Sequence, residues 1–173
     1  MNQHKPSDKD QTFEGVHFRT VNKASIKFPD LFYPAICDTG SVLLTHHKGG
    51  LLGIRPGNWE KFINSVDSLR ASKEEKFDLV KAFTDKAIFC PIHVDSYQKN
   101  EYGEINNAIE PIEAYLLAVP HEMIEMAKLD QLVVLVGMGH FFEIWSPPNW
   151  YKLKYRLRYR AVNKNKTFPD ITA

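Results

Sequence analysis

The 173-residue sequence has few of the features that mark several classes of protein. Its two cysteines, Cys37 and Cys90, are too few and too far apart to predict a disulfide framework or a zinc ribbon. No apolar run approaches the roughly 20 residues that span a bilayer. The polar start, residues 1–11, lacks the apolar region of a secretory signal and is predicted to be a disordered arm. We therefore expect a cytoplasmic protein with reduced thiols and no membrane contact.

The motifs of enzyme active sites are also missing. There is no Gly-x-Ser-x-Gly, no Gly-x-Gly-x-x-Gly after a strand and no Walker loop. Adjacent His46 and His47 would point to opposite faces of a strand, and Cys90 with His93 has no second ligand pair at zinc-site spacing. The sequence therefore predicts no enzyme, no catalytic residue, no cofactor and no metal site.

Charge is nearly balanced overall, with a net value of +1, but it is unevenly distributed. Seven cations and no acid lie between Trp150 and Lys166, whereas the rest of the chain carries 15 cations and 21 acids. Residues 151–173 are therefore predicted to be a basic C-terminal segment attached to an acidic body.

Within that segment, cations alternate with apolar residues at Lys152, Lys154, Arg156, Arg158 and Arg160. A strand would place these cations on one face about 6.6 Å apart, a spacing that suits a phosphate backbone. A helix would instead align Tyr151, Tyr155 and Tyr159 as a stripe. The alternative to phosphate binding is an amphipathic segment packed on its own body with a solvated cationic face, and the sequence leaves both open.

A pattern that recurs after 91 residues indicates an internal duplication. Pro29 and Trp59 match Pro120 and Trp150, and both stretches end in Pro-x-Asn-Trp. Two such tetrapeptides at equal distances from an earlier proline are difficult to obtain by chance.

Each copy is predicted to be a strand that ends at the proline, a short helix, a β-hairpin with a glycine turn, and a helix capped by asparagine. The expected strands are 12–21, broken by Gly15, and 26–28, and the expected short helices are 30–36 and 121–127. Hairpins are expected at 41–55 and 132–145, and a helix over 59–69 capped by Asn58, with Asn149 as the second cap. A capping box from Ser72 to Glu75 starts a further helix, and residues 87–94 form a strand.

The chain is therefore divided as follows: the arm 1–11, a first repeat 12–69, a connecting helix 70–86, a second repeat 87–150 with a polar insertion at 95–113, and the basic segment 151–173.

Several short motifs resemble the MraZ family of bacterial transcriptional regulators. They are Phe13-Glu14-Gly15 and Asn58-Trp59-Glu60 in the first copy, and Phe142-Glu143-Ile144-Trp145 in the second. The resemblance covers residues 12–155 apart from the insertion. It implies an α+β fold of two AbrB-like swapped-hairpin units joined by amphipathic helices. It also implies a ring of subunits that binds direct repeats in DNA and regulates the division and cell-wall gene cluster, in the cytoplasm and at the nucleoid.

The sequence departs from the family at its DNA-reading Asp-x-x-x-Arg motifs. Counting back from the two prolines, the motif positions hold Val21 and Ser25 in the first copy, and Ile112 and Leu116 in the second. If the insertion splits the second motif, Asp95 would stand for its acid, but no arginine follows, so only the intervening Lys23 of the first copy carries over. We therefore expect contacts to double-stranded DNA from other cations: Arg19, Lys23, Lys27, Lys152, Lys154, Arg156, Arg158 and Arg160. The alternative is an oligomeric scaffold or protein-binding module that no longer binds DNA.

Overall fold

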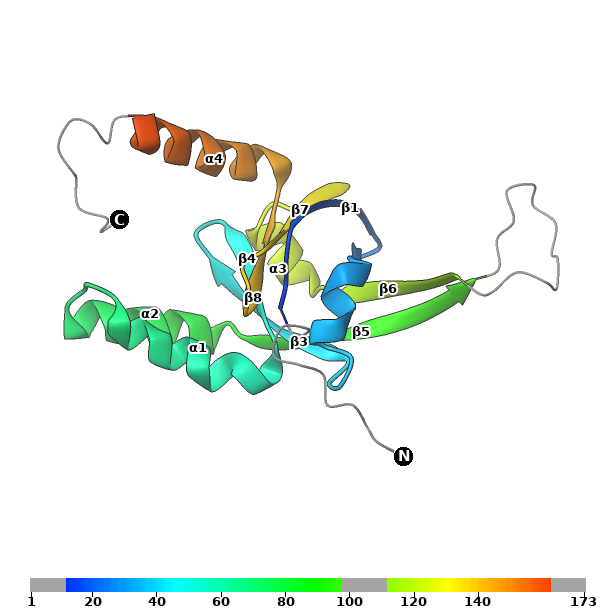
Figure 1. Ribbon diagram of the computed structural model, residues 1–173, viewed down its shortest axis with the longest axis horizontal. Coiled ribbons are helices and arrows are strands. Elements are labelled where there is room, and N and C mark those ends of the chain that lie inside the picture. Colours follow the sequence, from blue (N-terminus) through cyan, green and yellow to red (C-terminus); the bar gives the residue numbers. More distant parts are fainter. Residues whose placement is uncertain (1–11, 98–111, 163–173) are drawn as a thin grey trace.

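The computed structural model describes residues 12–97 and 112–162, except for the side chains of 96–97, 112–113 and 157–162 (Figure 1). The predicted arm 1–11 and most of the predicted insertion lie outside the described residues. The elements are β1 (Val16–Asn22), β2 (Ser25–Phe28), η2 (Asp30–Ala35), β3 (Ser41–His47), β4 (Gly50–Ile54), η3 (Pro56–Asn58), α1 (Trp59–Ser65), η4 (Val66–Ser68), α2 (Lys73–Asp85), β5 (Ile88–Tyr97), β6 (Ile112–Ala118), α3 (His121–Met126), β7 (Leu132–Gly137), β8 (Phe141–Trp145) and α4 (Pro147–Val162).

Eight antiparallel strands close into a barrel in the order β1-β2-β6-β5-β3-β4-β8-β7. The predicted mixed α+β class is confirmed, since helices cover part of this barrel. Exchanging β1, β2, β3 and β4 with β5, β6, β7 and β8, respectively, leaves the same neighbours around the closed barrel. Thus β1 pairs with β7 as β5 pairs with β3, so each half of the chain completes the sheet of the other half.

Four phenylalanines from distant segments fill the barrel. Phe142 contacts the rings of Phe13, Phe28 and Phe32 at centroid separations of 4.9, 5.6 and 5.5 Å. All four side chains are fully buried. Because their rings meet edge to face or tilted, they add contact energy to the burial of their area.

A second, smaller core lies between the barrel and the α1–α2 helices, which run side by side in Figure 1. Phe83 of α2 packs against Phe62 of α1 at 5.2 Å. The buried Thr45 hydroxyl on β3 donates to the carbonyl of Phe83 at 2.8 Å, which joins helix to sheet. The predicted capping box is confirmed, since Glu75 N donates to Ser72 Oγ and Ser72 N donates to Glu75 Oε2.

The predicted hairpin turns are confirmed at both sites. Lys48 and Gly49 have φ values of 50° and 84° between β3 and β4, and Gly139 has a φ of 84° between β7 and β8. Glycine adopts this left-handed conformation without a Cβ clash. The predicted break at Gly15 is confirmed: Gly15 has a φ of 85° and turns the chain, and β1 begins directly after it at Val16.

The predicted asparagine caps are wrong. Asn58 makes no capping bond, because the preceding turn Pro56–Asn58 is already helical in backbone conformation. In the second copy the helix begins at Pro147, ahead of Asn149. Pro147 and Pro148 lack N–H groups, so the first turn of α4 has fewer donors to satisfy. The helix predicted over 59–69 also ends early, at Ser65, and continues as the turn Val66–Ser68.

The β5–β6 hairpin differs from its counterpart in length. The two residues Lys23 and Ala24 connect β1 to β2, whereas β5 and β6 continue as a two-stranded arm that extends away from the barrel in Figure 1. Residues 95–97 and 112–113 of the insertion predicted at 95–113 lie in these paired strands.

Candidate nucleic-acid interface

The described part of the basic segment, residues 151–162, is helical, which settles the choice between strand and helix for these residues. α4 contains 16 residues and crosses the boundary predicted at Trp150 without interruption. Residues two apart on a helix are separated by about 200°, so alternating cations fall on opposite sides. The strand alternative, with five cations on one face, is therefore excluded, and the helix alternative holds, with Tyr151 and Tyr155 four residues apart in α4.

The first turn of α4 is fixed to the barrel by three contacts. Asn149 N donates to Ser146 Oγ at 3.4 Å, and Asn149 Nδ2 donates to the Gly49 carbonyl at 3.4 Å. The Trp150 ring meets Phe18 of β1 edge to face at 5.8 Å. These contacts set the direction in which the rest of the helix projects from the barrel in Figure 1.

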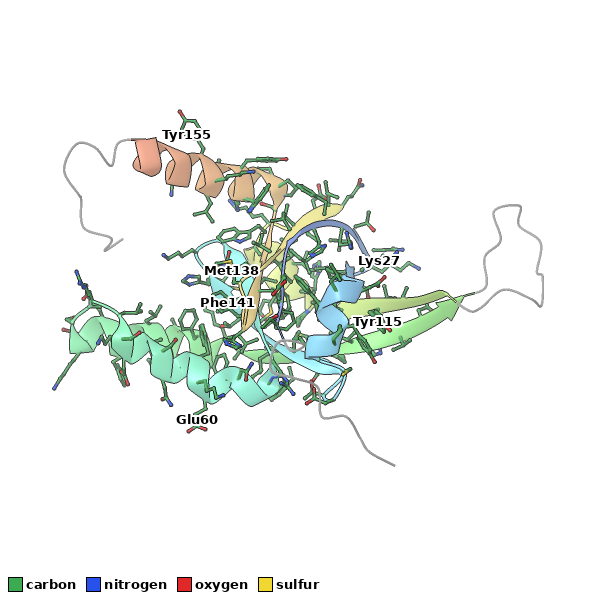
Figure 2. All side chains as sticks on the ribbon, in the orientation of Figure 1. Lys27, Glu60, Tyr115, Met138, Phe141 and Tyr155 are labelled. Atoms are coloured by element: carbon green, nitrogen blue, oxygen red, sulfur yellow. The ribbon has the colours of Figure 1, made fainter. Side chains whose placement is uncertain are left out.

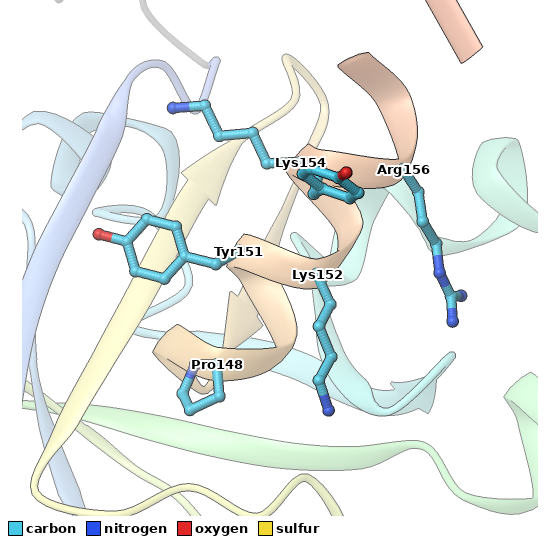
Figure 3. Close-up of a pocket in the computed structure, with 6 residues that line it drawn as sticks. Pro148, Tyr151, Lys152, Lys154 and Arg156 are labelled. Atoms are coloured by element: carbon cyan, nitrogen blue, oxygen red, sulfur yellow. The ribbon is translucent and has the colours of Figure 1, made fainter. Parts of the chain in front are cut away.

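Beyond that turn the helix presents cations and tyrosines to solvent. Lys152, Lys154 and Arg156 are exposed, and so are Tyr151 and Tyr155, which are 54% and 71% exposed. Figure 3 shows Lys152 and Arg156 extending from one side of α4 and Lys154 from the other. These five side chains and Pro148 line a shallow surface depression.

The charge on this surface is not neutralised within the described part of the chain. The sequence of α4 contains no acid. The ion pairs of the described residues join Arg55 to Asp38, Lys81 to Asp85 and His121 to Glu125, and none involves α4. Lys154 instead lies 4.8 Å from the centre of the Trp150 ring, a cation–π contact. Such a surface attracts a polyanion.

Lys128 is a further cation that the sequence did not single out. It follows α3 in the left-handed conformation, with a φ of 52°. It lines a second depression, which also includes Lys152 at the start of α4 and Asp130. Only the tertiary structure places Lys128 beside α4, because 24 residues separate it from Lys152.

The predicted cations of the first repeat lie elsewhere. Lys23 is exposed in the β1–β2 turn, with a φ of 47°. Lys27 is exposed on the outer face of β2, paired with Leu116 of β6. Arg19 is half-buried, pairs with the buried Val133, and donates from Nη1 to the Phe18 carbonyl at 2.8 Å. The strand register therefore places Arg19 on the inner face of the sheet and Lys27 on its outer face.

The predicted site residues thus form two separate groups. Figure 2 shows Lys27 well away from Tyr155 of α4. Arg158 and Arg160 belong to the last turns of α4, whose side chains lie outside the described residues. The α4 surface, made of Tyr151, Lys152, Lys154, Tyr155 and Arg156, is the larger described group and is called the α4 face below.

Strand register also corrects one position of the comparison with the Asp-x-x-x-Arg motif. Val21 pairs with Ile26, and Ile92 pairs with Leu117. Because Ile26 and Leu117 are 91 residues apart, Ile92 occupies the place of Val21. The assignment of Ile112 to this motif position is therefore wrong, because the β5–β6 arm separates Ile112 from Ile92. Both positions are apolar, so the register restores no acid to the motif.

The thiols and imidazoles offer no reactive arrangement among the described residues. Burial raises the pKa of Cys90 to about 11, which keeps it a thiol. Burial, with smaller effects from Lys48 and His46, lowers the pKa of His47 to about 4, so it is neutral at pH 7. No three His, Cys, Asp or Glu side chains of the described ranges gather as a metal site. No helix in those ranges is both long and apolar enough to cross a membrane.

Comparison with known proteins points to one family. A family model for MraZ proteins, described as antitoxin-like, matches residues 117–167. A transcriptional regulator MraZ of Desulfosudis oleivorans is 24% identical over 143 residues, which cover 82% of this chain and 85% of the relative. A transcriptional regulator MraZ of Roseiflexus castenholzii is 26% identical over 139 residues, which cover 80% of this chain and 83% of the relative.

Proposed function

The chain is a distant member of the MraZ family, and from that premise we propose that it binds double-stranded DNA and regulates transcription of the division and cell-wall gene cluster. It is not an enzyme. The observation that carries the DNA contact is the α4 face, where Lys152, Lys154 and Arg156 are exposed on a helix without acids. Cations in such an arrangement neutralise phosphates and release counterions on binding.

The cations of the β1–β2 hairpin supply a second contact. Lys23 and Lys27 are exposed there, and in the family's pattern this hairpin carries the DNA-reading motif. Here the motif positions Val21 and Ser25 hold no acid and no arginine, so these contacts position the protein on phosphates without reading bases. Arg19 contributes least, because it is half-buried and donates to a backbone carbonyl.

Each half of the chain is proposed to be an AbrB-like swapped-hairpin unit. The support is the strand order, in which β1 crosses to β7 of the other half and β5 crosses to β3. Under this proposal the chain has two repeats, 12–69 and 87–150. Helix 70–86 joins them, and the segment 151–173 follows. We propose that such units assemble into a ring at the nucleoid, so that weak phosphate contacts add across copies.

Fluorescence anisotropy with duplex DNA from its own promoter region, measured across a salt series, tests the proposal. Each phosphate contact adds roughly 0.9 to the slope of log affinity against log salt. Replacing both Lys152 and Arg156 with glutamine is expected to lower that slope by about 2 if each binds one phosphate. Lys81→Gln is the matched control, since Lys81 is exposed on α2 and pairs with Asp85. The α4 contact is rejected if the affinity for duplex DNA does not change with salt concentration. It is also rejected if Lys81→Gln lowers the slope as much as the double variant does.

An oligomeric scaffold or protein-binding module is the second candidate. Phe77 of α2 and Phe89 of β5 are 67% and 65% exposed, so neither ring is part of a core and both are free to contact another protein. This function predicts that the protein's biological interaction survives removal of residues 151–173 and fails in Phe89→Ser. The opposite result favours the DNA-binding function.

A further inference from the structure

The α4 face contains more than phosphate-binding cations. Tyr151 and Tyr155 are large rings left 54% and 71% exposed on a polar helix. Neither belongs to the two hydrophobic cores of the described chain. Packing among the described residues therefore leaves about half or more of each ring uncovered.

Their spacing places both rings on one face of α4. Four residues on a helix span about 6 Å along its axis, and their side chains point the same way. Each ring is followed directly by a cation, since Lys152 follows Tyr151 and Arg156 follows Tyr155. The Tyr151 ring rests against Trp150 at 5.2 Å, which restricts its motion. Consecutive residues lie about 100° apart around a helix, so Lys152 and Arg156 form a cationic ridge beside the ridge of the two tyrosines (Figure 3).

An aromatic face and a cation together match one nucleotide, because the ring stacks on the base while the cation binds the phosphate. In a duplex the bases already stack on each other, about 3.4 Å apart along each strand. The two tyrosines are about 6 Å apart along the helix axis, which is wider than the spacing of stacked bases. They therefore suit bases that are separated from each other, as in a single strand. The described part of α4 adds no acid that would repel the backbone.

We infer that the α4 face binds single-stranded nucleic acid, with bases stacked on Tyr151 and Tyr155 and phosphates on Lys152 and Arg156. This inference rests on the proposed nucleic-acid-binding function and extends it to a second substrate. An opened promoter strand and a nascent transcript both present this chemistry.

Anisotropy with the full chain and three labelled probes tests the inference: oligo-dT, oligo-rU and a duplex of equal length. Tyr155→Ala is expected to weaken single-strand binding by roughly 5- to 100-fold, which corresponds to about 1–3 kcal/mol per stacked base. Tyr155→Phe keeps the ring and should keep the affinity. Duplex affinity should fall much less than single-strand affinity in Tyr155→Ala, because paired bases offer no free face to the ring, and it should be kept in Tyr155→Phe. The ratio of the oligo-dT and oligo-rU affinities shows whether the natural ligand is DNA or RNA.

Folding is not at risk in this design, because Tyr155 is mostly exposed. Equal losses on duplex and single strand in Tyr155→Ala overturn the inference, and so does single-strand affinity that Tyr155→Ala leaves unchanged. If Tyr155→Ala lowers the particle mass measured by light scattering but not the single-strand affinity, a second copy of the chain covers the α4 face and the inference is wrong. Duplex binding that depends on Lys152 and Arg156 would stand in each of these cases, which separates this test from that of the proposed function.

Discussion

Replacing Gly53 with alanine should destabilise the barrel severely. Gly53 of β4 pairs with Phe142 of β8, whose ring lies directly over it. A Cβ at position 53 would lie 2.1 Å from the ring carbon Cζ of Phe142 and 2.4 and 2.5 Å from its two Cε atoms. Ordinary contact begins near 3.4 Å, so the ring would have to move by more than 1 Å.

The Phe142 ring has nowhere to move without disturbing the main core. It is fully buried and contacts three other buried phenylalanine rings. Overpacking costs about 1–3 kcal/mol, and each aromatic contact that loses its geometry adds about 0.5–1.5 kcal/mol. We expect a loss of about 3–5 kcal/mol, against a total stability of about 5–15 kcal/mol for a typical domain. The melting temperature should fall by about 10 °C or more.

Urea and thermal unfolding followed by circular dichroism measure this loss. Gly57→Ala is the control, because no atom lies within 4 Å of its Cβ and its stability should change by less than about 0.5 kcal/mol. Adding Phe142→Leu to Gly53→Ala should relieve the clash, so the double variant should lose less stability than the two single losses combined. A Gly53→Ala protein that melts like the wild type, or strictly additive losses, would refute this account of the core.

Three further predictions concern single side chains. Ser72→Ala removes the cap of α2 and should cost about 1 kcal/mol in urea unfolding, with Ser68→Ala as the exposed control. Stability should fall as the pH drops from about 6.5 towards 4, because unfolded His47 takes up a proton that the folded side chain, with a pKa of about 4, does not. The loss is expected to be about 1–2 kcal/mol after solvent screening, and an unchanged pH profile in His47→Gln would contradict it. A thiol reagent should modify exposed Cys37 quickly and the buried, protonated Cys90 only on unfolding; equal rates would contradict the fold at β5.

Local signals predicted most of the elements. The turn glycines, the capping box at Ser72 and the prolines at the strand ends act through backbone geometry within a few residues, so they could be recognised without the fold. The asparagine caps failed because neighbouring prolines shaped the backbone first. The alternating cations of α4 left strand and helix open, because a period of two favours a strand while the tyrosines four residues apart favour a helix. The segment continues a helix that begins at Pro147.

The candidate site could be predicted only in part. The sequence identified the α4 cations, because five of them with no acid stand out in any conformation. It could not separate them from Lys23 and Lys27, or place Lys128 beside them, because those distances depend on how the two halves of the chain pack.

The sequence alone determined that one pattern occurs twice, where the two glycine hairpins and the capped helix α2 lie, and that basic charge is concentrated at residues 152–166. Only the tertiary structure decided that each half completes the sheet of the other, and that Arg19 and Lys27 lie on opposite faces of the sheet. It also decided that α4 projects from the barrel with Tyr151 and Tyr155 exposed. The physical reason is that local backbone preferences act over a few residues. Strand partners and helix directions are instead set by burying side chains such as Phe142 and Trp150 against segments far away in the sequence.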